Sequence, residues 1–236
     1  MNNKLKSFLG IIISICVIYT ILFTCIDTWC FNRNFYAFEA KQLDLKTELG
    51  VNNHDLYNMS DTLLDYLSGY RNDIKVKVKS NGVVRMAYSD SEAKHMQDVR
   101  SLYQNAKMLR YVAIIVGLLF WLILRYENAQ EVYVLLSRVF LKTSIAFFIL
   151  ISALLLYAAS DFNTFWTNFH HVFFNNNLWL LPASSLMINL LPEPFFNHLV
   201  MVIIATFLVI FITLIIISRQ YLKKWKIKHL EKIYIE

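Results

Sequence analysis

Two places in the sequence put histidine where it could take part in acid–base chemistry. His95 has Glu92 three residues before it and Asp98 three residues after it, and on a helix these spacings bring side chains into contact. A carboxylate bonded to one ring nitrogen fixes the tautomer and raises the basicity of the other nitrogen, as a general base requires. The second place is the adjacent pair His170 and His171. The alternative is that His95 and these carboxylates form an exposed ion pair on the helix surface, which would contribute little to stability and nothing to catalysis.

The other three of the six histidines stand in less promising surroundings. His54 lies in a predicted turn and His229 in a basic tail, so both are expected at the solvated surface. His198 opens the last apolar run and fits a position at the membrane interface. We therefore expect the chemistry at His95 and at the pair 170–171.

A metal site and an enzyme nucleophile are both weaker interpretations of these residues. His95, His170, His171 and Asp98 would be enough to bind a metal, but no His-Glu-x-x-His or similar spacing occurs. There is also no Gly-x-Ser-x-Gly motif, and the three cysteines all lie in or just after the first apolar run. We expect no metal and no cofactor, with a metal-dependent enzyme kept as the alternative.

The elements that must position these histidines are predicted to be membrane helices. Hydrophobic residues make up 57% of the 236 residues, and the mean hydropathy is +0.43. Four apolar runs approach or reach the roughly 20 residues needed to span a bilayer: 7–26, 109–124, 139–157 and 199–218. The net charge of +6 is explained by basic residues at the cytoplasmic ends of spans, near anionic lipid, so we expect no nucleic-acid partner.

The distribution of basic residues predicts the orientation. The chain ends and the loop between the second and third spans carry Lys and Arg, whereas residues 160–198 contain neither. Because basic loops stay in the cytoplasm, residues 160–198 and the stretch 27–107 are predicted outside, with both termini inside.

The first outer stretch has the pattern of a small α+β cap. Alternating residues at 74–79 and 83–88 flank Asn81-Gly82, which predicts a β-hairpin with a type I′ turn. Helical spacing covers 35–49 and 60–67, with Ser60 or Asp61 as the expected cap of the second helix. Ser89 and Glu92 form a capping-box motif that opens a helix able to continue into the second span.

The second outer stretch combines polar residues with an unusual density of aromatic residues. Aromatic residues at the end of a span are ordinarily an interfacial belt, but a belt does not require nine of them within 161–198. We expect an interfacial or re-entrant segment that could hold a lipid tail.

These patterns predict a mainly α membrane protein with four transmembrane helices and a small α+β extracellular cap. The expected domains are a first span (1–27), the cap (28–107), the second and third spans with their cytoplasmic loop (108–158), the aromatic-rich segment (159–198), and the fourth span with a basic tail (199–236).

Two sequence motifs resemble those of the bacterial lipoprotein intramolecular transacylase family. The first is Tyr88-Ser89 followed by Glu92-x-x-His95-Met96-x-Asp98-Val99. The second is Phe169-His170-x-x-Phe173-Phe174-x-Asn176-x-x-Trp179, preceded by Asp161-Phe162 and followed by Leu190-Leu191-Pro192-Glu193-x-Phe195-Phe196. The order and spacing of the spans also resemble this family of four-helix membrane enzymes, so the likeness covers nearly the whole chain.

The resemblance implies a reaction on membrane lipoproteins in the bacterial plasma membrane, with the active site on the extracellular face. The sn-2 acyl chain of the diacylglyceryl cysteine would move to the α-amino group of the same cysteine, leaving a lyso-form lipoprotein. It implies His95 and His170 as the catalytic residues. Glu92 and Asp98, by their spacing from His95, and His171, as the neighbour of His170, are expected as supporting residues. The motif positions expected to line the substrate pocket are Tyr88, Phe169, Phe173, Phe174, Asn176, Trp179, Glu193 and Phe195.

The chemistry of this reaction fits the residues. Aminolysis of an ester needs a neutral amine and a proton for the leaving alkoxide, which two histidines can supply without an enzyme nucleophile. The reacting atoms close a ring of about eight members, so holding the substrate folded should supply most of the acceleration. The alternatives are a metal-dependent membrane hydrolase and a non-catalytic lipid-binding accessory protein.

Overall fold

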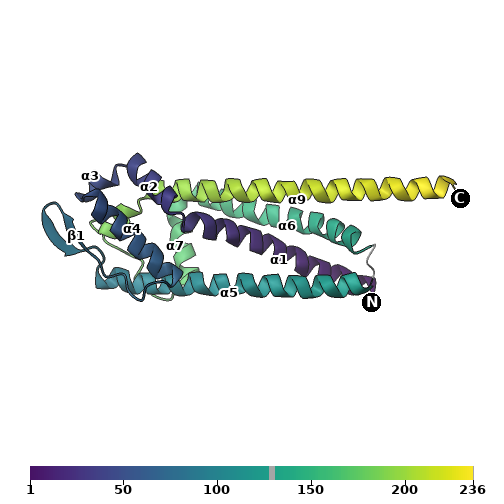
Figure 1. Cartoon of the computed structure of the whole chain (residues 1–236), viewed down its shortest axis with the longest axis horizontal. Helices are drawn as coiled ribbons and strands as arrows, with labels where there is room; N and C mark the ends of the chain where they lie inside the picture. Colours follow the sequence, from purple (N-terminus) through teal and green to yellow (C-terminus); the bar gives the residue numbers. More distant parts are fainter. Residues whose placement is uncertain (128–130, 236) are drawn as a thin grey trace. The chain divides into compact units, whose positions relative to one another are not determined.

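The fold is mainly α-helical with one two-stranded hairpin (Figure 1). The structure is a computed structural model that describes residues 1–127 and 131–235, with side chains through Lys228. It divides into two compact units, which we describe separately. The membrane unit contains residues 1–25, 108–165 and 205–236, and the cap unit contains residues 26–107 and 166–204.

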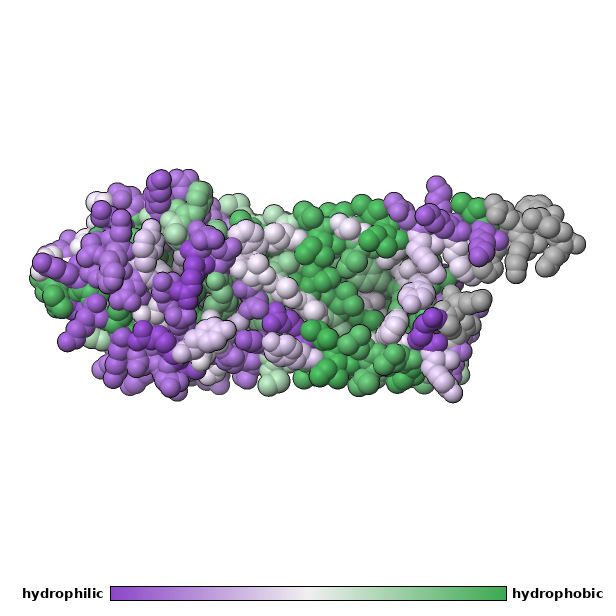
Figure 2. Space-filling model, viewed as in Figure 1, coloured by the Kyte–Doolittle hydropathy of each residue, from purple (hydrophilic) through white to green (hydrophobic). Residues whose placement is uncertain are grey.

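Four helices among the described residues are long and apolar enough to cross a membrane. They are α1 (Asn3–Cys30), α5 (Asp90–Glu127), α6 (Val132–Ser160) and α9 (Glu193–Ile235). Each contains one of the predicted spans, which confirms the four-helix membrane architecture. Hydrophobic residues gather along these helices on the face seen in Figure 2, as expected for surface that contacts lipid rather than water.

Small residues let the helices of the membrane unit approach one another closely. A methyl group added at Gly117 of α5 would lie 3.4 Å from the Cβ of Cys16 in α1, and one added at Gly10 would lie 3.4 Å from Val139 in α6. Such close approach is the usual way in which membrane helices gain packing energy, because lipid gives them no hydrophobic drive to associate.

The helix that carries His95 begins at the predicted capping box. The Glu92 amide donates to the hydroxyl of Ser89 at 3.4 Å, and the Ser89 amide donates to the Glu92 carboxylate at 2.5 Å. From this start α5 continues for 38 residues without interruption. This confirms both the capping box and the prediction that the helix runs into the second span.

The predicted hairpin is also confirmed. Strand β1 (Lys77–Ser80) pairs antiparallel with β2 (Val83–Met86), and Ser80 is opposite Val83. The two turn residues, Asn81 and Gly82, have φ angles of 50° and 81°. Positive φ at both central positions is the requirement of a type I′ turn.

The single helix predicted over 35–49 is in fact two. Helix α2 (Arg33–Gln42) ends before Asp44, which has a φ of 45°, and α3 (Leu45–Leu49) follows. The apolar periodicity continues through this break, so the sequence pattern did not indicate the left-handed backbone conformation of Asp44.

The predicted start of the next helix is wrong. Helix α4 (Asn53–Ser68) begins about two turns before Ser60, and the side chain of Asn52 caps it by accepting the Asp55 amide at 2.8 Å. Ser60 lies inside the helix, where its hydroxyl donates to the Leu56 carbonyl at 3.2 Å. The sequence 52–55 supplies an earlier cap than the one predicted, and the apolar stripe extends back to it.

The second outer stretch forms two short helices of different roles. Helix α7 (Phe162–Phe173) carries the histidine pair, and α8 (Leu186–Leu190) packs into the core of the cap unit. Buried residues from α3, α4, β1, α5 and α8 build this core, among them Leu49, Met59, Leu63, Val78, Met96 and Leu190. The core therefore includes Met96 of α5, which is next to His95 in the sequence, together with residues of α8.

Gly50 provides a test of how the hairpin is held. Its φ is 60°, its carbonyl accepts the Asn81 amide at 2.8 Å, and an added Cβ would overlap the side-chain amide of Asn81. We predict that Gly50→Ala lowers the free energy of unfolding by the left-handed penalty of about 1–2 kcal/mol, plus an overpacking cost of about 1–3 kcal/mol. Denaturant unfolding of the purified protein measures both.

Gly82→Ala is the matched control, because Gly82 also has positive φ but nothing lies within 4 Å of an added Cβ. It should show only the left-handed penalty. Adding Asn81→Gly to Gly50→Ala should recover the overpacking part. Equal losses for the two alanine variants would contradict the predicted overlap.

Candidate active site

His95 and His170 face each other inside the cap unit. Their ring centroids are 6.2 Å apart, and only 7% of His95 and 6% of His170 is exposed. His95 lies on the second turn of α5 and His170 near the end of α7. Two segments that are 75 residues apart in the sequence therefore bring two buried imidazoles within reach of one small group placed between them.

The ring of His170 is held in one orientation by its own helix. Its Nδ1 lies 2.8 Å from the carbonyl oxygen of Trp166, one turn earlier in α7. Because a carbonyl can only accept, Nδ1 carries the proton and Nε2 keeps a free lone pair. His170 is thus fixed in the tautomer that presents a basic nitrogen.

Aromatic rings enclose His170. Trp166 lies at 4.5 Å between centroids, Trp179 stacks on the imidazole at 4.6 Å and 29°, and Phe174 lies at 5.7 Å. Burial lowers the pKa of His170 below its ordinary value, and the charge of neighbouring His171 lowers the pKa further, although the bond to the Trp166 carbonyl opposes both. His170 is therefore neutral at pH 7.

The sequence predicts that Glu92 and Asp98 bond to the His95 ring, but the structure gives both carboxylates other partners. One Glu92 oxygen accepts the Ser89 amide, and the other accepts the hydroxyl of Ser185. Asp98 accepts the side-chain amide of Asn176 at 2.9 Å. The capping box and the bonds from Ser185 and Asn176 therefore use the carboxylate oxygens that helical spacing alone would assign to His95.

Two buried nitrogen atoms in this cluster have no hydrogen-bond partner among the described residues. They are Nδ1 of His95 and the indole Nε1 of Trp179. His95 packs against Phe174 with centroids 5.3 Å apart, and Trp179 stacks on His170. Unsatisfied buried polar atoms are rare in folded proteins and call for an explanation such as a bound ligand or a catalytic role.

The remaining expected site residues fall into two groups. The ring centroid of Phe169 lies 5.5 Å from that of His170 and 4.8 Å from that of Phe173, and the centroid of His171 lies 5.6 Å from that of Trp179. These residues therefore border the histidine cluster, by which we mean His95, His170 and the aromatic rings around them. The other three lie elsewhere in the cap unit, and their expected place in the substrate pocket stays a prediction. Tyr88 is buried with its hydroxyl donated to the Met59 carbonyl, Phe195 is buried against Phe35 and Tyr36, and Glu193 is exposed in the first turn of α9.

The other histidines take different places. His54 lies in the first turn of α4 rather than in a turn, and its side chain is exposed as predicted. His198 contacts the buried carboxylate of Glu39 at 2.7 Å, a pairing with no signal in the sequence. His229 falls outside the described side chains. Among the described residues, no group of three or more His, Cys, Asp or Glu is arranged to hold a metal ion.

Two residues that orient the site were missed by sequence reasoning. Trp166 orients His170 through its backbone carbonyl. Its position four residues before His170 on a helix could have indicated this contact. Ser185 bonds Glu92 across 93 residues, and no local pattern could have indicated this.

A known family model matches most of this chain. The model of the family described as lipoprotein intramolecular transacylase Lit matches residues 11–196. A search of curated proteins found no match.

Solved structures of a protein of that description share the fold. The membrane integral lipoprotein intramolecular transacylase Lit from Bacillus cereus superposes with a TM-score of 0.74 at 19% identity, covering 96% of this chain and all of the other. A variant of it with one histidine replaced by alanine superposes with a TM-score of 0.72 at 19% identity, covering 95% of this chain and 96% of the other. A variant with arginine in place of a histidine gives 0.72 at 18%, covering 95% of each chain.

The cause of the low pKa of His170 can be tested directly. In His171→Gln the neighbouring charge is removed while burial remains, so the pKa of His170 should rise from its value in the unchanged protein yet stay below the ordinary histidine value. Nuclear magnetic resonance of ring-labelled histidine, titrated in detergent, measures this pKa. His54→Gln should leave it unchanged, and a fall in His171→Gln would contradict the assignment.

Proposed function

Because the chain belongs to the lipoprotein intramolecular transacylase family, we propose that it moves the sn-2 acyl chain of a lipoprotein's diacylglyceryl cysteine to that cysteine's own α-amino group. Family membership makes the chain an integral membrane acyltransferase that acts on lipoproteins. The proposed product is a lyso-form lipoprotein with an N-acyl terminus. The observation that carries the two-histidine mechanism is the pair of buried imidazoles with centroids 6.2 Å apart.

His170 is the proposed base. Its Nε2 has a free lone pair because Nδ1 is bonded to the Trp166 carbonyl, and it is neutral at pH 7. An α-amino group ordinarily has a pKa of about 7.7–8.0, so a neutral imidazole can take its proton as the nitrogen attacks the ester carbonyl.

His95 is the proposed acid. As the new C–N bond forms, the sn-2 C–O bond breaks, and the glycerol oxygen must receive a proton. Burial and the nearby charge of His170 lower the pKa of His95, so His95 is neutral before the reaction. It gives its N–H proton to the leaving oxygen as the proton that His170 took from the amine reaches the other nitrogen of its ring, so one proton returns between the two rings. Their separation permits this return through a substrate atom or a single water.

Trp179 supplies a donor for the oxygen that becomes negative in the tetrahedral intermediate. Its buried indole N–H has no partner among the described residues, and its ring stacks on His170. A donor already held in an apolar site stabilises developing charge without reorganisation. The surrounding aromatic rings would also exclude water, so that amide formation is favoured over hydrolysis.

The mechanism needs no enzyme nucleophile, because donor and acceptor belong to one substrate molecule. The three cysteines are all in α1, and the aromatic cluster offers no serine to either imidazole among the described contacts. Folding the substrate so that about eight atoms close a ring gives the cap its main task, which is to hold the amine against the ester.

The first prediction of this mechanism concerns the histidines. His95→Ala and His170→Ala should each lower the rate by about 10²–10⁴-fold, because each removes a proton-transfer group. The assay uses purified protein in detergent and a diacylglyceryl lipopeptide with a free amino terminus, and mass spectrometry with fragmentation locates the acyl chain.

The control is His54→Ala, which removes an exposed histidine on α4 and should retain full activity. Full activity in either cluster variant would exclude the two-histidine mechanism. Loss of activity on chelation, restored by zinc, would favour a metal-dependent hydrolase. Isotope label arriving from bystander phospholipid would mean a separate acyl donor. No conversion by the unchanged protein would favour a non-catalytic lipid-binding role.

We also propose that both termini lie in the cytoplasm and that the cap faces the outside of a bacterial plasma membrane. The support is the charge bias of the loops, since residues 160–198 contain no Lys or Arg while the opposite helix ends are basic. The substrate's lipidated cysteine would then meet the active site on the extracellular face.

Cysteine labelling tests this orientation. In a background with the three natural cysteines replaced by serine, Lys77→Cys and Ser184→Cys should react with an impermeant thiol reagent in intact cells. Tyr126→Cys should react only after the membrane is opened. All three positions are exposed, so the difference reports the side of the membrane rather than burial. Labelling of Tyr126→Cys in intact cells would reverse the proposed topology.

A further inference from the structure

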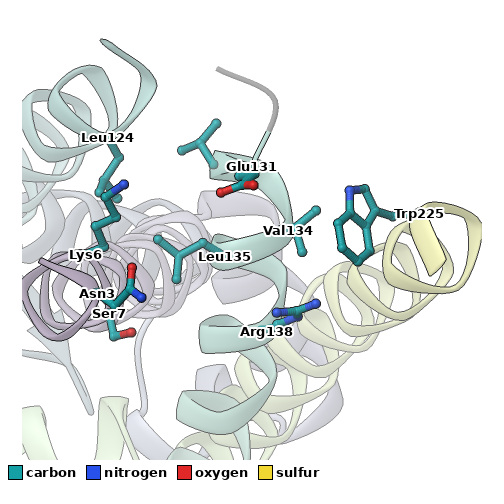
Figure 3. A pocket seen from close by; sticks show the side chains of 10 residues that line it. Asn3, Lys6, Ser7, Leu124, Glu131, Val134, Leu135, Arg138 and Trp225 are labelled. Atoms are coloured by element: carbon teal, nitrogen blue, oxygen red, sulfur yellow. The ribbon is translucent and has the colours of Figure 1, made fainter. Parts of the chain in front are cut away.

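A cavity of about 320 Å³ lies in the membrane unit, among the ends of its four long helices (Figure 3). Figure 3 shows Asn3, Lys6 and Ser7 of α1 on one side, with Arg138 of α6 and Trp225 of α9 on the other. The remaining lining residues are Leu124 of α5 and Glu131, Val132, Val134 and Leu135 at the start of α6. It is separate from the histidine cluster, which belongs to the cap unit.

The lining residues lie at the ends of the four apolar runs or a few residues beyond them. Lys6 directly precedes the first apolar run, Leu124 ends the second, and Arg138 directly precedes the third. Trp225 follows the end of the fourth run by seven residues. The cavity therefore lies at the boundary between hydrocarbon and water, where tryptophan and basic residues are enriched.

The cavity combines positive charge with an apolar wall. Among the described lining residues, Lys6 and Arg138 are basic and Glu131 is acidic. Lys6 also lies 3.4 Å from Glu127, in a pair that is partly exposed and so weak enough to be exchanged. Leu124, Val132, Val134 and Leu135 provide apolar surface within the same cavity.

Arg138 is the most informative of these residues. Its guanidinium lies 5.4 Å from the centre of the Trp225 ring, and no carboxylate pairs with it among the described residues. A cation–π contact of this kind uses the charge of the guanidinium and does not bond its N–H donors. An unpaired planar fork of this kind matches the oxygens of a phosphate.

We propose that this cavity binds the headgroup of an anionic phospholipid, with Arg138 on the phosphate and Lys6 as the second positive charge. Asn3 and Ser7 supply hydrogen bonds to the headgroup alcohol, and the apolar wall receives the glycerol end of the acyl chains. The volume of about 320 Å³ is many times what one water molecule needs, so the cavity has room for a glycerol phosphate. The lipid source is favoured because the cavity is level with the ends of the apolar runs.

Native mass spectrometry of the purified full chain tests this site. Phosphatidylglycerol and phosphatidylcholine with the same acyl chains are added in parallel, and inorganic phosphate is added in a third series. We expect phosphatidylglycerol to bind about tenfold more tightly than phosphatidylcholine, with phosphate unable to displace it. Arg138→Gln should lower this preference severalfold, because one of the two positive charges that favour an anionic over a zwitterionic headgroup is lost. Arg138→Lys should lower the affinity for both lipids, because they share the phosphate that the fork contacts.

Lys223→Gln is the matched control, since it removes one exposed positive charge from the same end of α9 without lining the cavity. It should keep the preference within about twofold. Because the preference is a ratio within one protein, it does not depend on the amount of folded variant. Equal binding of the two lipids by the unchanged protein would overturn the proposal. An equal loss of the preference in Lys223→Gln and Arg138→Gln would also overturn it, because the lipid would then respond to the overall positive charge of this end. Displacement of the lipid by inorganic phosphate would overturn it too, because the site would then bind a free anion.

Discussion

The Glu92 carboxylate accepts two hydrogen bonds that come from segments far apart in the sequence. One comes from the Ser89 amide and starts α5, and the other comes from the Ser185 hydroxyl, which also caps α8. A buried carboxylate must have its acceptors filled, so both segments are held to this one group. Among the described residues, the arrangement leaves His95 with no hydrogen-bonded carboxylate and places it beside aromatic rings. A histidine in that setting can exchange protons with a substrate, whereas a histidine in an ion pair would be held charged.

Much of the fold follows from local patterns. The four spans are predicted because length and apolarity alone decide whether a helix can cross a bilayer. The type I′ turn at Asn81-Gly82 and the capping box at Ser89 and Glu92 are predicted because each depends only on residues within a few positions. The break at Asp44 was missed because the apolar periodicity on both sides continues through it.

The candidate site was predictable in its members but not in its hydrogen bonds. The motifs identify His95 and His170 as candidates, and the structure places their rings next to each other. Helical spacing assigned Glu92 and Asp98 to His95, whereas the actual partners, Ser185 and Asn176, lie 93 and 78 residues away. Tertiary packing decides whether a carboxylate bonds a nearby donor or one that is distant in the sequence. A single sequence does not show which distant donors will be packed against it.

The contacts of Asn176 and Ser185 have an evolutionary consequence. Both bind α5, at Asp98 and Glu92, which are six residues and so about 9 Å apart along the helix. The chain between Asn176 and Ser185 could stretch to roughly 30 Å, so it closes a loop with slack. Insertions in such a loop cost little free energy, because closure entropy grows only slowly with length. Descendants of this protein can therefore gain residues at the exposed positions 182–184 while both histidines keep their places.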